Sequence, residues 1–102
     1  MHTHTLVVVV RVIYLYNYKE VERAIFYTVA AKIYIRNIGD GRGNIDKSVG
    51  VTIGVNAETI GKLYGGDWMM MPLTCIDADD VTANPDTDNT VVLEYIMFYE
   101  EA

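Results

Sequence analysis

Hydrophobic residues alternate with a period of two along much of this chain, which is the pattern of a β-strand. In residues 8–18 the even positions carry only valine and tyrosine, and the odd positions are also mainly apolar. Residues 49–55 and 90–100 alternate in the same way. These segments are rich in β-branched and aromatic side chains, which fit a pleated surface, so the pattern predicts three strands.

Residues 17–32 fit two structures. Asn17 followed by Glu20 is typical of a capped helix start, and an apolar stripe at helical spacing follows it. As a strand, however, the alternation runs without a break into the strand-like residues 33–36. We favour the strand and keep the helix as the alternative.

Two segments have the composition of loops. Residues 38–46 contain three glycines, two aspartates and an asparagine, which predicts a loop built from turns. Residues 75–89 contain five aspartates, two asparagines and a proline, which predicts a long polar loop.

The pair Gly65-Gly66 separates two further apolar segments. Because both glycines can adopt a positive φ, they predict a type I′ turn between two paired strands. That register pairs Leu63 with Trp68, and it places Trp68 over the flat surface left by Gly61.

Composition supports a β fold. Of the 102 residues, 13 are Val, 10 are Ile, 9 are Thr and 8 are Tyr, whereas 5 are Leu and none is Gln. Such a chain favours sheets over helices, and its length is that of one domain. We predict a single all-β domain over residues 1–102, a small β-sandwich of jelly-roll-like form. The alternative is an α+β ferredoxin-like domain of order βαββαβ, with helices at residues 17–32 and 56–64.

Charge and hydropathy exclude some partners. The chain has 8 Lys and Arg against 14 Asp and Glu, a net charge of −6, and no basic cluster that could neutralise a nucleic-acid backbone. The apolar run that begins at Leu6 is interrupted by Arg11 and falls short of the roughly 20 residues that cross a bilayer. Cys75 is the sole cysteine, which is typical of a protein made in the cytoplasm. We expect neither nucleic acid nor a membrane as partner.

The first and last predicted strands carry apolar side chains on both faces. A sandwich strand needs one apolar face, and a domain of this size buries only about two-thirds of its unfolded surface. We therefore expect another subunit to cover one face, so that the chain assembles with itself. A helix within residues 17–32 that covers the sheet is the alternative. The candidate assembly residues are Val10, Val12, Tyr14, Tyr16, Trp68, Met70, Tyr95, Met97 and Tyr99.

No set of residues predicts catalysis. The glycines of residues 39–43 lack the spacing and the terminal Lys-Ser or Lys-Thr of a phosphate-binding loop, so we interpret them as a turn. Cys75 has no basic neighbour that would activate it, and His2 and His4 have no third metal ligand in reach. Five aspartates lack the pattern of a calcium loop and are interpreted as a solvated loop, although an ion site shared between subunits stays open: Asp77, Asp79, Asp80, Asp86 and Asp88. We expect no catalytic residue, no metal and no cofactor.

From Lys32 onward, strands and turns follow one another in a recognisable order. The series consists of Lys32-Ile-Tyr-Ile-Arg-Asn37 and a Gly-Asp-Gly loop, Val51-Thr-Ile-Gly-Val55, Leu63-Tyr-Gly-Gly-Asp67 with a strand ending in Pro72-Leu73, Asp80-Val81, and Thr90-Val-Val-Leu-Glu-Tyr95. This series resembles the small β-sandwich virion proteins of tailed bacteriophages, such as capsid decoration (cement) proteins and head or tail accessory proteins. The resemblance implies a non-enzymatic virion protein, made in the host cytoplasm, that binds copies of itself and a capsid or tail protein.

Overall fold

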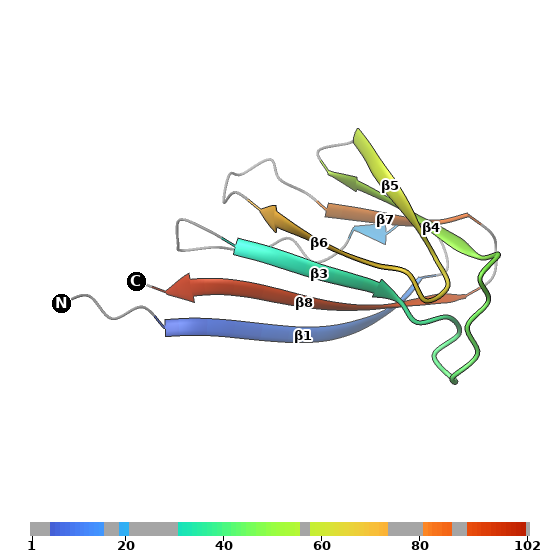
Figure 1. Ribbon diagram of the computed structural model, residues 1–102, viewed down its shortest axis with the longest axis horizontal. Helices are drawn as coiled ribbons and strands as arrows, with labels where there is room; N and C mark the ends of the chain where they lie inside the picture. Colours follow the sequence, from blue (N-terminus) through green and yellow to red (C-terminus); the bar gives the residue numbers. More distant parts are fainter. Residues whose placement is uncertain are drawn as a thin grey trace.

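The computed structural model describes residues 5–15, 19–20, 31–55, 58–73, 81–86 and 90–101, and within these ranges it contains eight strands and no helix. The strands are β1 (Thr5–Leu15), β2 (Lys19–Glu20), β3 (Ala31–Asn37), β4 (Gly50–Val55), β5 (Glu58–Tyr64), β6 (Trp68–Leu73), β7 (Val81–Pro85) and β8 (Val91–Glu101). They form two antiparallel sheets (Figure 1). The first sheet has the order β1-β8-β3-β6, and the second has the order β2-β7-β4-β5.

The strand pairs reveal how the chain is wound. β1 pairs with β8, β2 with β7, β3 with β6 and β4 with β5, as in one long hairpin whose turn lies between β4 and β5. Rolling up this hairpin adds the pairs β3–β8 and β4–β7 and so completes both sheets. This winding is that of a double-sheet jelly roll. The predicted all-β sandwich is confirmed. The ferredoxin-like alternative is wrong, because residues 19–20, 31–32 and 58–64 are extended where it requires helices.

The core lies between the two sheets. Successive side chains of a strand point to opposite faces, so each strand contributes alternate residues to this core. The residues that are almost fully buried there are Leu15, Ile33, Ile35, Val51, Ile53, Ala83, Val91 and Leu93. The three strands predicted from alternation correspond to β1, β4 and β8, and the strand predicted at residues 33–36 lies in β3. Residues 16–18 and 21–30, where strand and helix competed, are outside the described ranges.

The hairpin predicted at Gly65-Gly66 is wrong. A turn is present, because the N–H of Asp67 donates to the carbonyl oxygen of Tyr64 at 2.8 Å. Only Gly66 has a positive φ, however, at 92°, which fits a type II turn and not type I′. β5 pairs with β4, and β6 pairs with β3, so the turn carries the chain from one sheet to the other. Trp68 therefore lies in the first sheet and does not cover a residue of β5.

The turn between β5 and β6, where the chain crosses from one sheet to the other, requires glycine at position 65 because it is closely packed. A Cβ atom there would overlap the backbone carbonyl of Asp46, which cannot move away as a flexible side chain could. We expect Gly65→Ala to lower the free energy of unfolding by about 2 kcal/mol, the usual cost of overpacking. Gly61→Ala is the matched control, because a Cβ on Gly61 meets no atom within 4 Å. Urea unfolding measures both variants, and equal stabilities would contradict this account of the crossing.

β7 lies inside the segment predicted to be a polar loop. Its residues Val81, Ala83 and Pro85 are buried, and the strand sits between β2 and β4. The loop prediction is therefore wrong at Val81–Pro85. Pro85 is tolerated because it is the last residue of the strand, where a missing N–H disturbs the ladder least. The predicted loop at residues 38–46 is confirmed.

Candidate functional site

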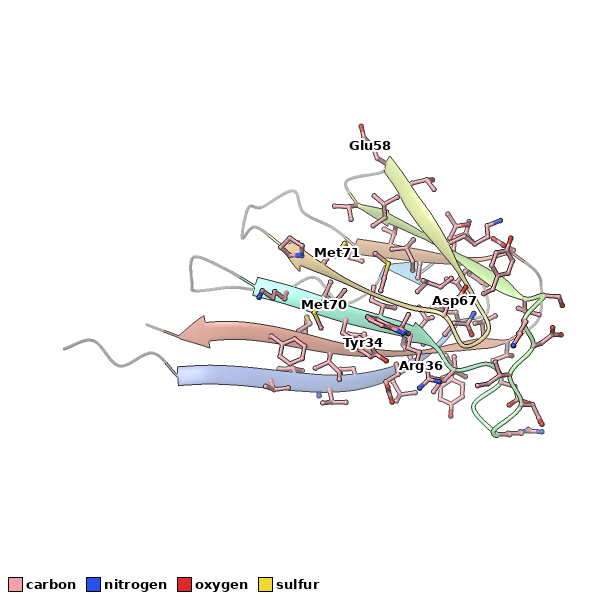
Figure 2. All side chains as sticks on the ribbon, in the orientation of Figure 1. Tyr34, Arg36, Glu58, Asp67, Met70 and Met71 are labelled. Carbon is pink, nitrogen blue, oxygen red and sulfur yellow. The ribbon has the colours of Figure 1, made fainter. Side chains whose placement is uncertain are left out.

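One face of the first sheet is turned away from the core, and we call it the outer face. It consists of Val8, Val10, Val12 and Tyr14 on β1, Glu94, Ile96 and Phe98 on β8, Lys32, Tyr34 and Arg36 on β3, and Trp68, Met70 and Pro72 on β6. All of these residues except Lys32, Arg36 and Glu94 are apolar or aromatic. Figure 2 labels three residues of this face, Tyr34 and Arg36 on β3 and Met70 on β6.

Several apolar side chains of the outer face are about half exposed or more. The exposed fraction is 54% for Val10, 51% for Tyr14, 62% for Trp68 and 52% for Met70. Strand spacing and rise give the face an area of about 500 Å². The largest apolar patch on a soluble protein is commonly of this order, and it is often a binding surface.

Strand register arranges the outer face in rows that cross all four strands. One row consists of Val10, Ile96, Tyr34 and Met70, and the next consists of Val12, Glu94, Arg36 and Trp68. The first of these rows is apolar throughout. The second has two opposite charges at its centre and apolar side chains at both ends.

The two charges at the centre of the face are cross-strand neighbours, but neither forms an ion pair among the described residues. The ion pair formed among the described residues lies on the second sheet, between Lys62 and Asp86, so Arg36 and Glu94 take part in none. The Nε atom of Arg36 is buried and has no hydrogen-bond partner. A buried donor without an acceptor costs about 1–3 kcal/mol, and more when it is charged. Because neither charge is used in an ion pair among the described residues, an opposite charge supplied by another molecule would stabilise a complex at this position.

An aromatic pair supports the edge of the outer face at β6. The rings of Tyr34 and Trp68 have their centroids 6.0 Å apart and are tilted by 36°. Aromatic side chains at this separation attract one another, and they are among the commonest anchors of protein interfaces. Trp68 is thus held in place on the face while most of its surface stays open to solvent.

The loop at residues 38–46 limits the outer face at the end of β1 where Tyr14 lies. Val92 would belong to this face by alternation, but it is fully buried. A Cβ atom on Gly41 would lie 3.0 Å from the Cγ2 atom of Val92 and 3.3 Å from the ring of Tyr14, so the loop backbone covers this position. The N–H of Val92 also donates to the carbonyl oxygen of Gly39 at 2.8 Å. The accessible part of the face therefore ends at Tyr14.

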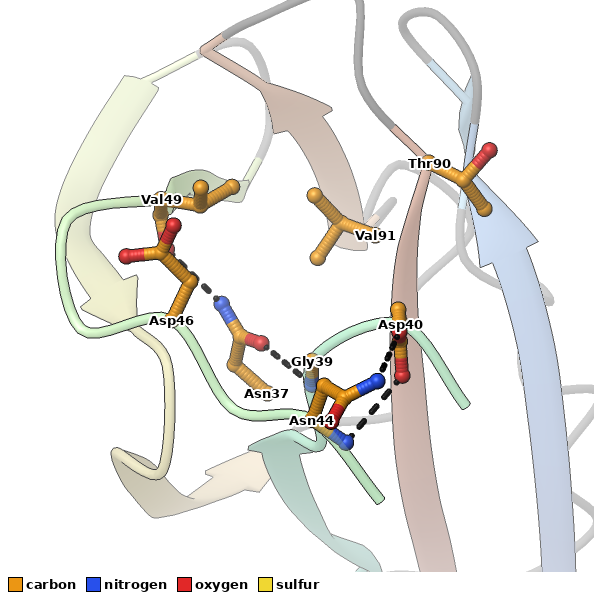
Figure 3. Close-up of a pocket in the computed structure, with 8 residues that line it drawn as sticks. All are labelled: Asn37, Gly39, Asp40, Asn44, Asp46, Val49, Thr90 and Val91. Carbon is orange, nitrogen blue, oxygen red and sulfur yellow. Dashed lines mark hydrogen bonds between the residues drawn. The ribbon is translucent and has the colours of Figure 1, made fainter. Parts of the chain in front are cut away.

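A cavity of about 280 Å³ lies beneath this loop (Figure 3). Asn37 lines it and is 1% exposed. Its Nδ2 donates to the carbonyl oxygens of Leu63 at 3.0 Å and Val49 at 3.3 Å, and its Oδ1 accepts from the N–H of Gly39 at 3.0 Å. Asn37 thus joins the end of β3 to the loop and to β5. Its polar atoms hold the fold together and are not free to bind a ligand.

The carboxylate of Asp40 in the same loop is likewise used within the chain. It accepts hydrogen bonds from the side chain of Asn44 at 2.9 Å and from the N–H of Arg42 at 2.7 Å. These donors, that of Asn44 above all, keep the pKa of Asp40 below its ordinary value. The predicted turn at residues 39–43 is confirmed, since its three glycines all have positive φ.

Five of the nine predicted assembly residues lie on the outer face: Val10, Val12, Tyr14, Trp68 and Met70. Tyr95 and Met97 do not, because they are 4% and 6% exposed and belong to the core cluster, so their assignment to the assembly surface is wrong. Tyr16 is outside the described residues, as is the side chain of Tyr99.

On β8 the sequence did not identify the residues of the outer face, because both faces of this strand are apolar. The predicted assembly residues Tyr95 and Met97 lie on one face of β8, whereas Ile96, on the other face, pairs directly with the exposed Val10 of β1. Alternation places both sets on the strand, but only the pairing of β8 with its neighbours decides which set meets the second sheet. The other residues missed on the outer face are Val8, Lys32, Tyr34, Arg36, Pro72, Glu94 and Phe98.

Most of the weaker candidates lie outside the described residues: His2, His4, Cys75, Asp77, Asp79, Asp80 and Asp88. Asp86 is described, and its carboxylate accepts from the Nζ of Lys62 at 3.0 Å and from the hydroxyl of Thr52 at 3.1 Å. This contact, chiefly its hydrogen bond, raises the pKa of Lys62. Where the structure describes the chain, no group of three or more His, Cys, Asp or Glu could hold a metal ion. None of the described segments forms a helix with the length and hydrophobicity that a membrane crossing needs.

Comparison of the sequence with protein-family models and with curated proteins found no match. The physical properties of the outer face therefore carry the functional argument.

Proposed function

We propose that this protein is a non-enzymatic structural protein of a virion, either a capsid decoration (cement) protein or a head or tail accessory subunit. It acts by protein–protein contacts, first with copies of itself through the outer face and then with a capsid or tail protein. Its place of action is the virion, after synthesis in the host cytoplasm.

The observation that carries this proposal is the apolar, half-exposed outer face. The backbone that carries Val10, Trp68 and Met70 is held by a four-stranded sheet, so covering these residues costs little backbone conformational freedom. Two such faces in contact would bury a total of about 1,000 Å², which is where specific interfaces begin. An assembly surface accounts for this face more simply than a catalytic site does.

The architecture gives secondary support by analogy. Double-sheet jelly rolls build viral capsid domains, and they also build lectins and cupins. A shared fold does not by itself establish a shared function. The jelly-roll architecture of this chain is consistent with the resemblance of residues 32–95 to small virion proteins of tailed bacteriophages. The outer face adds the surface that such a role requires.

Protein analysis of purified particles tests this proposal. We expect tailed phage particles that carry this gene to contain the chain in stoichiometric amounts after density-gradient purification, as measured by quantitative mass spectrometry. A chain that is abundant in the infected cell but absent from the particles would contradict the virion assignment.

A further inference from the structure

We infer that the outer face binds the outer face of a second copy of this chain, related by a twofold axis that is parallel to the strands and runs between β3 and β8. This inference rests on the proposed function, because it takes the outer face to be an assembly surface. It adds the identity of the partner, the orientation of the two copies and the residues that select this orientation.

Rotation about this axis exchanges β8 with β3 and β1 with β6, and it keeps each row opposite the same row of the second copy. Glu94 of each copy then faces Arg36 of the other. At the edges, Val12 faces Trp68. The strands of the two sheets stay aligned, which is the usual arrangement when sheets pack face to face.

Charge selects this orientation over the other one that keeps the strands aligned. A twofold axis perpendicular to the strands would place each strand opposite itself. If that axis crosses the row of Arg36, then Glu94 meets Glu94 and Arg36 meets Arg36. If it crosses the neighbouring row, Arg36 meets Lys32. Like charges facing each other across an interface are strongly unfavourable, so only the axis parallel to the strands gives complementary charges.

Side-chain size favours the same orientation. The β1 edge of the outer face carries valines, including Val10 and Val12, whereas the β6 edge carries the larger Met70 and Trp68. Along these two edges, the proposed axis sets Met70 and Trp68 of one copy against Val10 and Val12 of the other. An axis perpendicular to the strands would set large against large and small against small, which leaves gaps along one edge and clashes along the other.

The chemistry of Arg36 gives the pairing a further reason. Its guanidinium group forms no ion pair among the described residues, and it donates in a planar fork that matches a carboxylate. In the proposed dimer, Glu94 of the second copy supplies that carboxylate from directly above. Because the relation is symmetric, the two copies form two such contacts.

Charge reversal tests this geometry by sedimentation velocity. Arg36→Glu places a glutamate opposite Glu94 of the other copy, and Glu94→Arg places an arginine opposite Arg36 of the other copy. We expect each variant alone to be monomeric, with a Kd at least about 100-fold higher than that of the wild type. An equimolar mixture of the two variants is expected to form a heterodimer, because both cross-copy contacts between residues 36 and 94 are then between opposite charges. The double variant R36E/E94R is expected to dimerise as well.

Lys32→Glu is the matched control, since it makes the same charge change on the same strand. In the proposed dimer Lys32 faces Phe98, so the effect of this variant on the Kd is expected to stay below about tenfold. Circular dichroism establishes that every variant retains the β fold. The charged side chains project from the face opposite the core, so folding is expected to survive.

Three results would overturn this inference, and they have different consequences for the proposed function. If both single variants dimerise as tightly as the wild type while Val10→Asp does not, the orientation is wrong and the outer face remains an assembly surface. If the mixture stays monomeric, the cross-copy pairing is wrong. If the wild type itself is monomeric, the second copy is wrong as the partner, and particle analysis then decides separately whether the virion assignment stands.

Discussion

Val10→Asp is expected to convert the assembled protein into a folded monomer. Val10 lies in the fully apolar row of the outer face and is 54% exposed in a single chain, so the carboxylate stays hydrated in the monomer. In an assembly the same carboxylate would be buried among apolar side chains, at a cost of several kcal/mol. The Kd should rise by at least about 100-fold, as measured by size-exclusion chromatography with light scattering.

Ile60→Asp provides the matched control for this variant. Ile60 is an exposed apolar residue of similar accessibility, 46%, but it lies on β5 at the edge of the second sheet. We expect it to leave the Kd within about threefold of the wild type. If the two aspartate variants behave alike, the effect does not come from the outer face, and the assignment of the assembly surface is wrong.

Asn37→Ala is expected to destabilise the fold by about 3 kcal/mol, which corresponds to a fall in Tm of roughly 10–20 °C. The loss has two sources. The carbonyl oxygens of Leu63 and Val49 lose their side-chain donor, and the N–H of Gly39 loses its acceptor. Because Asn37 is 1% exposed, water does not readily replace these bonds. Thermal unfolding followed by circular dichroism measures the change.

The control for Asn37 is another asparagine of a strand. Asn84 lies on β7 and is exposed, so Asn84→Ala should change the stability by less than about 0.5 kcal/mol. A variant at Asn37 that unfolds at the temperature of the wild type would contradict its role as the link between β3, β5 and the loop.

Local patterns were sufficient to predict most of the strands. β1, β4 and β8 are segments in which β-branched and aromatic residues alternate over many positions, so local preference and tertiary structure agree. β7 was missed because Val81–Pro85 contains Ala, Asn and Pro, which have a low preference for strands. Its position between β2 and β4 supplies the hydrogen bonds and the burial that stabilise it as a strand, although its sequence does not indicate one.

The partners of strands were harder to predict than the strands themselves. Gly65 and Gly66 identify a turn, but a turn can join two strands of one sheet or of two different sheets. Contacts with residues far away in sequence decide between these outcomes. The N–H of Gly66 donates to the carbonyl oxygen of Asn37 at 2.9 Å, and the N–H of Asn37 donates to that of Asp67 at 3.0 Å. These bonds draw the start of β6 to β3.

The difference between predicting a strand and predicting its partner also explains which residues of the candidate site could be found from the sequence. The excess of apolar strand surface is visible in the sequence, and Val10, Val12 and Tyr14, which it selected on β1, are exposed in the single chain. The choice between the two apolar faces of β8 depends on the pairing of Ile96 with Val10, which no local pattern contains. The opposite charges of Arg36 and Glu94 become neighbours only through the pairing of β3 with β8.

The fluorescence of Trp68 tests most directly whether the outer face is covered in solution. It is the sole tryptophan of the chain, and it is 62% exposed in a single copy. On titration from low to high micromolar protein, we expect the emission maximum to shift to the blue and the rate of acrylamide quenching to fall, while Val10→Asp stays red-shifted and quenchable. A wild-type Trp68 that remains open to acrylamide across the whole range would contradict assembly through the outer face.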